Sequence, residues 1–243
     1  MSDSVDPDAL PSSRSILFYQ TASGQMYEQM LKATEKLHRA YCAANGLDYV
    51  TFIGIRRGYH PWQATFNRIE MVGDLLDAGF RGWFVYVDAD AVVVQTSFDL
   101  RRYLGKRENY ALIAASAGDE VWQVNAGIFF LNFDHACGRE IAARWRASAH
   151  AVICDAMLES AAEPWQRMPD GREFPDDQHL LHVELRGEPR LAAAVLSERS
   201  GLINLGGGRF IRQLIRLTGS PLERLQAIRR LVLERLGPDA TEN

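Results

Sequence analysis

Lysine and cysteine are both scarce in this chain of 243 residues. Only three lysines accompany 24 arginines, and the formal net charge is −4, so there is no overall basic field to attract nucleic acid. The three cysteines, Cys42, Cys137 and Cys154, form no CxxC pair, which excludes a disulfide framework and a cysteine-rich zinc site. No apolar run approaches the roughly 18 residues of a membrane span.

The first 14 residues lack the basic start and apolar core of a secretory signal peptide. We therefore expect a cytoplasmic protein with disordered tails at residues 1–14 and 237–243. A hydrophobic content of 47% and a charged content of 24% are typical of a globular chain. The sequence thus predicts one domain over residues 15–236.

Strand and helix patterns alternate through the first half of the chain. Apolar runs predict strands at 16–19, 47–55, 83–87, 91–94, 110–115 and 127–133, and helical spacing predicts helices at 26–45, 66–76 and 135–150. Further helices are expected at 177–185, 209–217 and 221–236. The run Trp83–Val87 is continuous rather than alternating, which is typical of a strand covered on both faces. These patterns predict an α/β fold with a mainly parallel sheet flanked by helices, followed by C-terminal helices.

Two carboxylates, Asp88 and Asp90, follow directly after the strand at 83–87. Ligands bind at the carboxyl ends of strands in open α/β sheets, and a pair of Asp residues there can hold a hard divalent cation. An acidic turn between two strands is the alternative. We expect Asp90→Asn to abolish metal-dependent activity, because the substitution removes a charge that offsets the metal. Two buried carboxylates without a cation repel, so the same substitution is expected even to raise the stability of the metal-free protein.

Three other segments carry candidate binding residues. Asn125 and Gly127 precede an apolar strand, and either contact a sugar or simply open the strand. Asp177 and Gln178 stand at a predicted helix start, where the alternative for the acidic group is helix capping. The glycine run 206–208 leads through Arg209 into a predicted helix, which suits phosphate binding, although a flexible connector fits as well.

Taken together, these segments resemble the metal-dependent glycosyltransferases of GT-A fold, most closely glycosyltransferase family 34 and next family 8. The resemblance covers residues 15–185 and rests on the order and spacing of four segments. These are Tyr41-Cys42 with Asn45–Tyr49, His60-Pro61-Trp62 with Arg68-Ile69, Trp83–Val94, and Val124–Asn132 followed by Asp177-Gln178.

The resemblance implies a donor site. It places Mn²⁺ (or Mg²⁺) on Asp88 and Asp90, where the ion would meet the diphosphate of a UDP-sugar. It places Thr21, Ala22 and Tyr27 against the nucleotide. Families 8 and 34 usually add a C-terminal His as third metal ligand.

The resemblance also implies a sugar site, at which Asn125 and Gly127 contact the donor sugar and Asp177 and Gln178 flank the anomeric carbon. Transfer of a hexose or pentose to a hydroxyl of a glycan or small molecule, with retained configuration, would follow. The last His of this chain is His182, so Asn204 or a water molecule is expected as the third metal ligand.

Two rival functions remain open. A phosphohydrolase of haloacid-dehalogenase type also places two Asp residues after a strand, but it needs a Lys between its acidic motifs, for which only Lys106 is present. A catalytically degenerate nucleotide-sugar-binding protein is the second rival. The Arg-rich C-terminal helices are predicted to present a solvated, ion-paired face, with peripheral contact to an anionic membrane or acceptor as the alternative.

Overall fold

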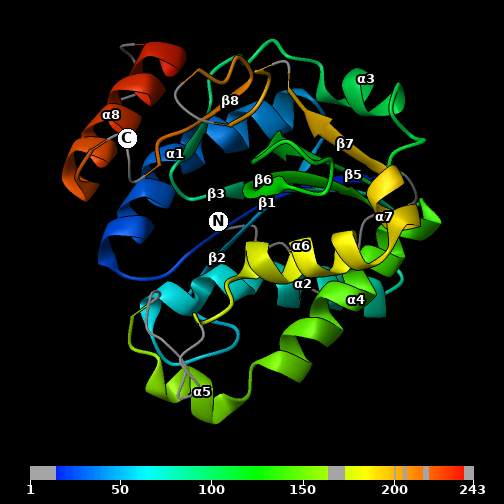
Figure 1. Cartoon of the computed structure of the whole chain (residues 1–243). Helices are drawn as coiled ribbons and strands as arrows, with labels where there is room; N and C mark the ends of the chain where they lie inside the picture. The colour runs from blue at the N-terminus through cyan, green and yellow to red at the C-terminus, as the bar shows by residue number, and fades with distance from the viewer. Residues whose placement is uncertain (1–14, 164–172, 200, 205–206, 216–218, 238–243) are drawn as a thin grey trace.

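The computed structural model describes residues 15–163, 173–199, 201–204, 207–215 and 219–237 (Figure 1). Its strands are β1 Ser15–Ala22, β2 Asp48–Ile53, β3 Gly82–Asp88, β4 Ala91–Val93, β5 Leu112–Ser116, β6 Val124–Asn132, β7 Val195–Glu198 and β8 Ile211–Gln213. Its helices are α1 Gln25–Ala44, α2 Asn67–Asp77, α3 Leu100–Gly105, α4 Ala136–Val152, α5 Asp155–Ser160, α6 Asp177–Gly187, α7 Pro189–Ala193 and α8 Pro221–Leu236, with a 3₁₀ helix, η1, at Pro61–Phe66. The predicted tails lie outside the described residues, apart from Gly237.

Six strands form the central sheet in the order β2-β1-β3-β6-β5-β7. Strand β1 pairs in parallel with β2 and β3, and β5 pairs in parallel with β7, whereas β6 runs antiparallel to both β3 and β5. Only β6 is therefore reversed, and the predicted mainly parallel α/β fold is confirmed.

Helices cover both faces of this sheet, with α1 and α8 on one side and α2, α4 and α6 on the other (Figure 1). In β3, Phe84 and Tyr86 face the α2–α4–α6 side, whereas Trp83, Val85 and Val87 join the core on the opposite face. Because both faces are buried, the run Trp83–Val87 is unbroken and apolar, as its sequence indicated. No helix in the described part of the chain combines the length and hydrophobicity that a membrane span requires.

The segment after the glycine run corrects one prediction. Residues 211–213 form strand β8, which pairs antiparallel with β4, so the helix expected at 209–217 is wrong. At Gly208, an added Cβ would collide with the backbone oxygens of Ile211 and Asn204. Glycine is thus required here by a tight backbone turn into a strand, and no helix N-terminus follows it.

The last helix, α8, agrees with its predicted bounds. Ser220 caps it: its hydroxyl accepts the Glu223 N–H at 3.3 Å, and the Glu223 carboxylate accepts the Ser220 N–H at 2.7 Å. Its apolar stripe, which includes Leu225, Ile228 and Val232, packs with α1 and β4 in a third hydrophobic cluster. This packing fixes α8 beside the carboxyl ends of β1 and β3.

Candidate active site

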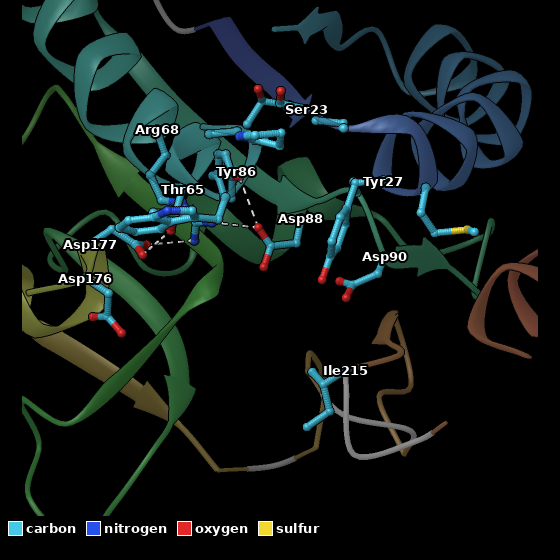
Figure 2. Close-up of a pocket in the computed structure, with 18 of the residues that line it drawn as sticks. Ser23, Tyr27, Thr65, Arg68, Tyr86, Asp88, Asp90, Asp176, Asp177 and Ile215 are labelled. Carbon is cyan, nitrogen blue, oxygen red and sulfur yellow. Dashed lines mark hydrogen bonds and ion pairs between the residues drawn. The ribbon is translucent and has the colours of Figure 1, made fainter. Parts of the chain in front are cut away.

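A cavity of about 730 Å³ opens at the carboxyl ends of β1 and β3 (Figure 2). The parallel register places Thr21 of β1 beside Asp88 of β3, so both strand ends contribute to its wall. Tyr27 and Asp90 lie together at one end, and Asp177 lies at the other (Figure 2). The cavity is lined by 20 residues, among them the predicted site residues Thr21, Ala22, Tyr27, Asp88, Asp90 and Asp177.

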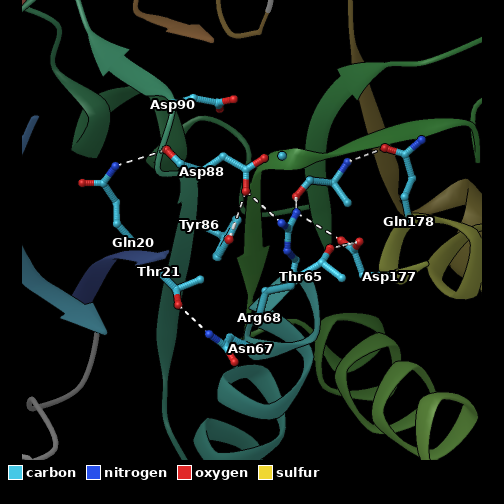
Figure 3. A network of polar contacts seen from close by, with 12 residues as sticks. Gln20, Thr21, Thr65, Asn67, Arg68, Tyr86, Asp88, Asp90, Asp177 and Gln178 are labelled. Atoms are coloured by element: carbon cyan, nitrogen blue, oxygen red, sulfur yellow. Dashed lines mark hydrogen bonds and ion pairs between the residues drawn. The ribbon is translucent and has the colours of Figure 1, made fainter. Parts of the chain in front are cut away.

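Asp88 is held from three directions. Its Oδ1 accepts from the Arg68 Nη2 at 2.8 Å and from the Tyr86 hydroxyl at 3.0 Å, and its Oδ2 accepts from the Gln213 Nε2 at 2.8 Å. Arg68 reaches it from α2 and lies over the Tyr86 ring, 4.3 Å from the ring centroid. The contacts of Oδ1 with Arg68 and Tyr86 fix the orientation of the carboxylate (Figure 3).

Asp90 is paired with a buried arginine of α8. The Arg224 Nη1 lies 2.8 Å from the Asp90 Oδ2, and the Gln213 Nε2 lies 3.1 Å from the Asp90 Oδ1. Burial, followed by the neighbouring charge of Asp88, raises the pKa of Asp90 to about 7, against the opposing effects of Gln213 and Arg224. The solvated face expected for the Arg-rich helices is therefore wrong at Arg224, whose side chain is 1% exposed.

Gln213 bridges the two carboxylates and fits a cation site. Its Nε2 donates to both, while its Oε1 is buried without a hydrogen-bond partner among the described residues. Gly127 lies beneath it: an added Cβ would approach the Asp88 Oδ2 and the Gln213 Nε2 to 2.7 Å. Rotating the amide by about 180° would present Oε1 toward both carboxylates, and together they form the all-oxygen donor set that Mg²⁺ and Mn²⁺ prefer.

No group of three His, Cys, Asp or Glu side chains that could hold a metal occurs in the described part of the chain. A metal at Asp88 and Asp90 would therefore need the amide of Gln213 or a water molecule as a further ligand. Asn204, the residue expected in this role, has its Oδ1 buried without a hydrogen-bond partner among the described residues. Gln213, and not Asn204, is the residue whose side-chain amide contacts both carboxylates.

Asp177 begins α6 at the other end of the cavity. Its Oδ1 accepts from the Thr65 hydroxyl, and its Oδ2 forms an ion pair with the Arg68 Nη1 at 3.1 Å but no hydrogen bond among the described residues. Burial raises the pKa of Asp177 to about 6, an effect that Arg68 partly offsets. Asp176 is the helix cap, since its Oδ1 accepts the His179 N–H at 2.7 Å.

Arg68 joins the two ends of the cavity. Burial opposes its charge, but Asp177 and Asp88 outweigh that effect and raise the pKa of the Arg68 guanidinium. It also donates to the Ala126 carbonyl oxygen. The result is a continuous row from Asp88 through Arg68 to Asp177 (Figure 3).

Gln178 and Asn125 hold the start of strand β6 and are not among the residues that line the cavity. The Gln178 Oε1 accepts the Ala126 N–H at 3.0 Å, and the Asn125 Oδ1 accepts the Gly127 N–H at 2.8 Å. Their predicted contacts with a sugar or the anomeric carbon stay predictions. The same holds for the predicted phosphate contact of Arg209, which is exposed and is not among the lining residues.

A polar network fixes the end of β1. The Asn67 Nδ2 donates to the Thr21 Oγ1 at 2.7 Å and to the Gly54 carbonyl oxygen at 2.9 Å, which ties the ends of β1 and β2 to α2. The Gln20 Nε2 donates to the Asp88 carbonyl oxygen at 3.2 Å. Backbone as well as side chain is thus positioned at Asp88 (Figure 3).

Sequence reasoning assigned Arg68 no role in the site, although Arg68 lies in a segment that carries the resemblance, and it pointed to neither Gln213 nor Arg224 as a site residue. Arg224 left a readable signal, because it falls on the same helical stripe as Leu225 and Ile228, where a buried arginine needs an anionic partner. No sequence signal pointed to Gln213, because the helix expected at 209–217 did not indicate that its side chain faces the two carboxylates.

Lys106, which a phosphohydrolase of haloacid-dehalogenase type would need, is exposed at the end of α3 and does not line the cavity. A phosphohydrolase of this type is expected to carry its two Asp residues after an early strand, whereas Asp88 ends the third strand along the chain.

Comparison with known proteins establishes the fold. No family model matches the chain, and no curated protein matches its sequence. The chain is similar in structure to a glycosyltransferase involved in the glycosylation of the major capsid of PBCV-1, with a TM-score of 0.62 and 15% identity over 89% of this chain and 99% of that one. It also matches mouse xyloside xylosyltransferase 1 (apo form), with a TM-score of 0.45 and 7% identity over 86% of this chain and 100% of that one. The first likeness, with the sheet described above, shows a GT-A-like fold.

Proposed function

We propose that this chain is a glycosyltransferase that transfers a hexose or pentose from a UDP-sugar to a hydroxyl of an acceptor glycan or small molecule, with Mn²⁺ (or Mg²⁺) as cofactor. The observation that carries the proposal is the convergence of Asp88, Asp90 and the bridging Gln213 at the cavity on the carboxyl ends of β1 and β3. The likeness in fold to the PBCV-1 glycosyltransferase supports it.

The cation would be held by Asp88, Asp90 and the Oε1 of Gln213. When bound, it would supply positive charge that stabilises the departing diphosphate. Gly127 keeps this space open, because any side chain there would enter it. Thr21, Ala22 and Tyr27, which line the adjoining wall, would contact the nucleotide.

Asp177 would bind the donor sugar or orient the acceptor. Its Oδ2 lacks a hydrogen-bond donor among the described residues, and sugar hydroxyls supply such donors. The ion pair with Arg68 and the hydrogen bond from Thr65 favour an ionised Asp177 carboxylate that accepts hydrogen bonds in a fixed position. They disfavour a general base that takes up a proton. Arg68, which pairs with both carboxylates, would fix the position of Asp177 relative to Asp88.

Transfer would then retain the anomeric configuration. On one face of the sugar, the acceptor oxygen forms its bond to the anomeric carbon as the bond to the diphosphate oxygen breaks. The acceptor proton passes to a diphosphate oxygen, so no protein base is required. Developing positive charge on the sugar ring would be stabilised by the carboxylate of Asp177.

The test is a screen of UDP-, GDP- and dTDP-sugars for Mn²⁺-dependent release of sugar, with Asp88→Asn and Asp90→Asn as inactive variants. Proton NMR of the product from a UDP-α-sugar should show an α-linkage, and a β-linkage would refute retention. Binding of UDP without sugar release would identify a degenerate binding protein. Turnover of p-nitrophenyl phosphate with Mg²⁺, without sugar release, would identify a phosphohydrolase.

A further inference from the structure

The carboxylates of the proposed cation site already carry partners of opposite charge. Asp90 pairs with Arg224, and Asp88 pairs with Arg68, which also pairs with Asp177. Three carboxylates and two guanidinium groups leave a net charge of −1 in this cluster when all are ionised. Asp176 is exposed, so water screens its charge from the cluster.

From this balance we infer that the cavity takes up its divalent cation together with a nucleoside diphosphate. The positive charge of Arg224 is what prevents tight binding of the cation alone. The inference rests on the proposed function, since it concerns the same cation site. A cation by itself would change the net charge of the cluster from −1 to +1. The two negative charges of a UDP-sugar diphosphate would return it to −1.

Burial makes this charge balance decisive. Arg224 and Asp90 are both buried, and unit charges interact several-fold more strongly there than in water. A cation beside Asp90 would therefore be repelled by the guanidinium that lies 2.8 Å from the same carboxylate. A diphosphate that enters with the cation offsets this repulsion.

Arg224 cannot easily turn away from the site. Its Nη1 also donates to the Leu214 carbonyl oxygen at 3.1 Å, and its Nη2 donates to the Tyr27 hydroxyl at 3.3 Å. The guanidinium lies over the Tyr27 ring, 5.4 Å from the ring centroid. The packing of α8 against α1 holds this group in place, so its charge stays next to Asp90.

Gln213 adds a second cost to binding of the cation alone. Its Nε2 donates to both carboxylates, and these two hydrogen bonds must be lost before Oε1 can face a cation. The rotation becomes favourable once the cation brings enough compensating interactions, and the oxygens of a diphosphate provide them. Charge and hydrogen bonding therefore both favour joint binding.

The experiment measures binding without turnover. Calorimetric titration at pH 8 under nitrogen gives the Kd of Mn²⁺ with and without saturating UDP, for the wild type and for three variants. Arg224→Met removes the charge at similar length, and Arg224→Lys keeps it. Arg235→Met is the matched control on the same helix, because among the described residues Arg235 donates to the Val94 carbonyl oxygen and pairs with Glu234, away from Asp90.

We expect UDP to lower the Kd of Mn²⁺ at least about tenfold in the wild type, in Arg224→Lys and in Arg235→Met. In Arg224→Met, Mn²⁺ alone should bind at least about tenfold more tightly than to the wild type, and the effect of UDP should shrink by a similar factor. A merely structural role of Arg224 would weaken binding in this variant instead of strengthening it.

The wild-type measurement decides the inference even if a variant fails to fold. An Mn²⁺ affinity that UDP changes less than twofold would overturn it, and sugar release by the same protein would leave the proposed function standing. If Mn²⁺ binds neither alone nor with UDP, both the inference and the proposed metal dependence are wrong.

Discussion

Arg224 of α8 lies 2.8 Å from Asp90, although 134 residues separate them in the sequence. Both side chains are buried, so each is the counter-ion that makes burial of the other tolerable. This pair attaches the C-terminal helix to the loop that follows β3. The stability of the cavity thereby depends on a residue that sequence patterning assigned to the surface.

Asp90→Asn should destabilise the protein at pH 8, because the buried Arg224 cation, 2.8 Å away, loses its counter-charge. Burial and the repulsion from Asp88, which raise the pKa of Asp90, are relieved by the same substitution and offset part of this cost, so we expect a loss of about 1 kcal/mol. The sequence alone, in which the pairing with Arg224 was not foreseen, favoured the opposite sign, and that expectation stays untested. Urea unfolding measures the change, and the double variant Asp90→Leu with Arg224→Met should recover most of the loss. An Asp90→Asn protein more stable than the wild type would show that relief of the repulsion from Asp88 outweighs the ion pair with Arg224.

Gly127→Ala should abolish metal-dependent sugar release while the protein still folds. The added Cβ would come within 2.7 Å of the Asp88 Oδ2 and the Gln213 Nε2, and relieving this overlap costs about 1–3 kcal/mol. Gly187→Ala is the control, since an added Cβ at the end of α6 meets nothing within 4 Å. Equal turnover in the two variants would mean that the space above Gly127 is not used.

Asp177→Asn should lower kcat by about 100-fold and change the Kd of the donor much less, because the lost charge acts chiefly on the transition state. Steady-state kinetics and UDP-sugar titration measure the two effects. Asp176→Asn, which keeps an oxygen for the cap on His179, should lower kcat far less. A larger effect at Asp176 would reassign the catalytic carboxylate.

His38 should make stability dependent on pH in the acidic range. The ring is buried between two fixed partners: its Nδ1 lies 2.7 Å from the Gln20 Oε1, and its Nε2 accepts the Val93 N–H at 3.0 Å. Burial lowers the pKa of His38 from 6.5 to about 3. The unfolded chain therefore binds a proton below pH 6.5 that the folded protein does not bind.

It follows that the His38 contribution to stability is complete above pH 6.5 and is lost as the pH falls from there toward 3. The free energy of unfolding should decrease by about 1.4 kcal/mol for each pH unit more in the wild type than in His38→Gln. Urea unfolding at several values between pH 6 and pH 4 measures the difference. Parallel curves for the two proteins would show that His38 is protonated in the folded state.

Local sequence was sufficient for most of the elements and for the carboxylates at the centre of the site. The unbroken apolar run before Asp88 predicted strand β3 and its burial on both faces, because hydrophobic patterning acts over neighbouring residues. Pro221 and the Ser220 and Glu223 pair mark the start of α8 in the same way.

Local patterning was not sufficient at residues 209–217. Apolar residues there are spaced as in a helix, yet Ile211–Gln213 pairs with β4, and only this pairing aims Gln213 at Asp88 and Asp90. A three-residue strand has too little sequence to show its period, so a tertiary partner decides its conformation.

The sequence by itself determined which residues could carry the chemistry: two carboxylates after a buried strand and a third at the start of a helix. Only the tertiary structure decided what neutralises them. Arg68, Gln213 and Arg224 come from α2, β8 and α8, and they meet the carboxylates because the helices pack against opposite faces of the sheet. Electrostatic partners across such distances are set by packing, and no local pattern records them.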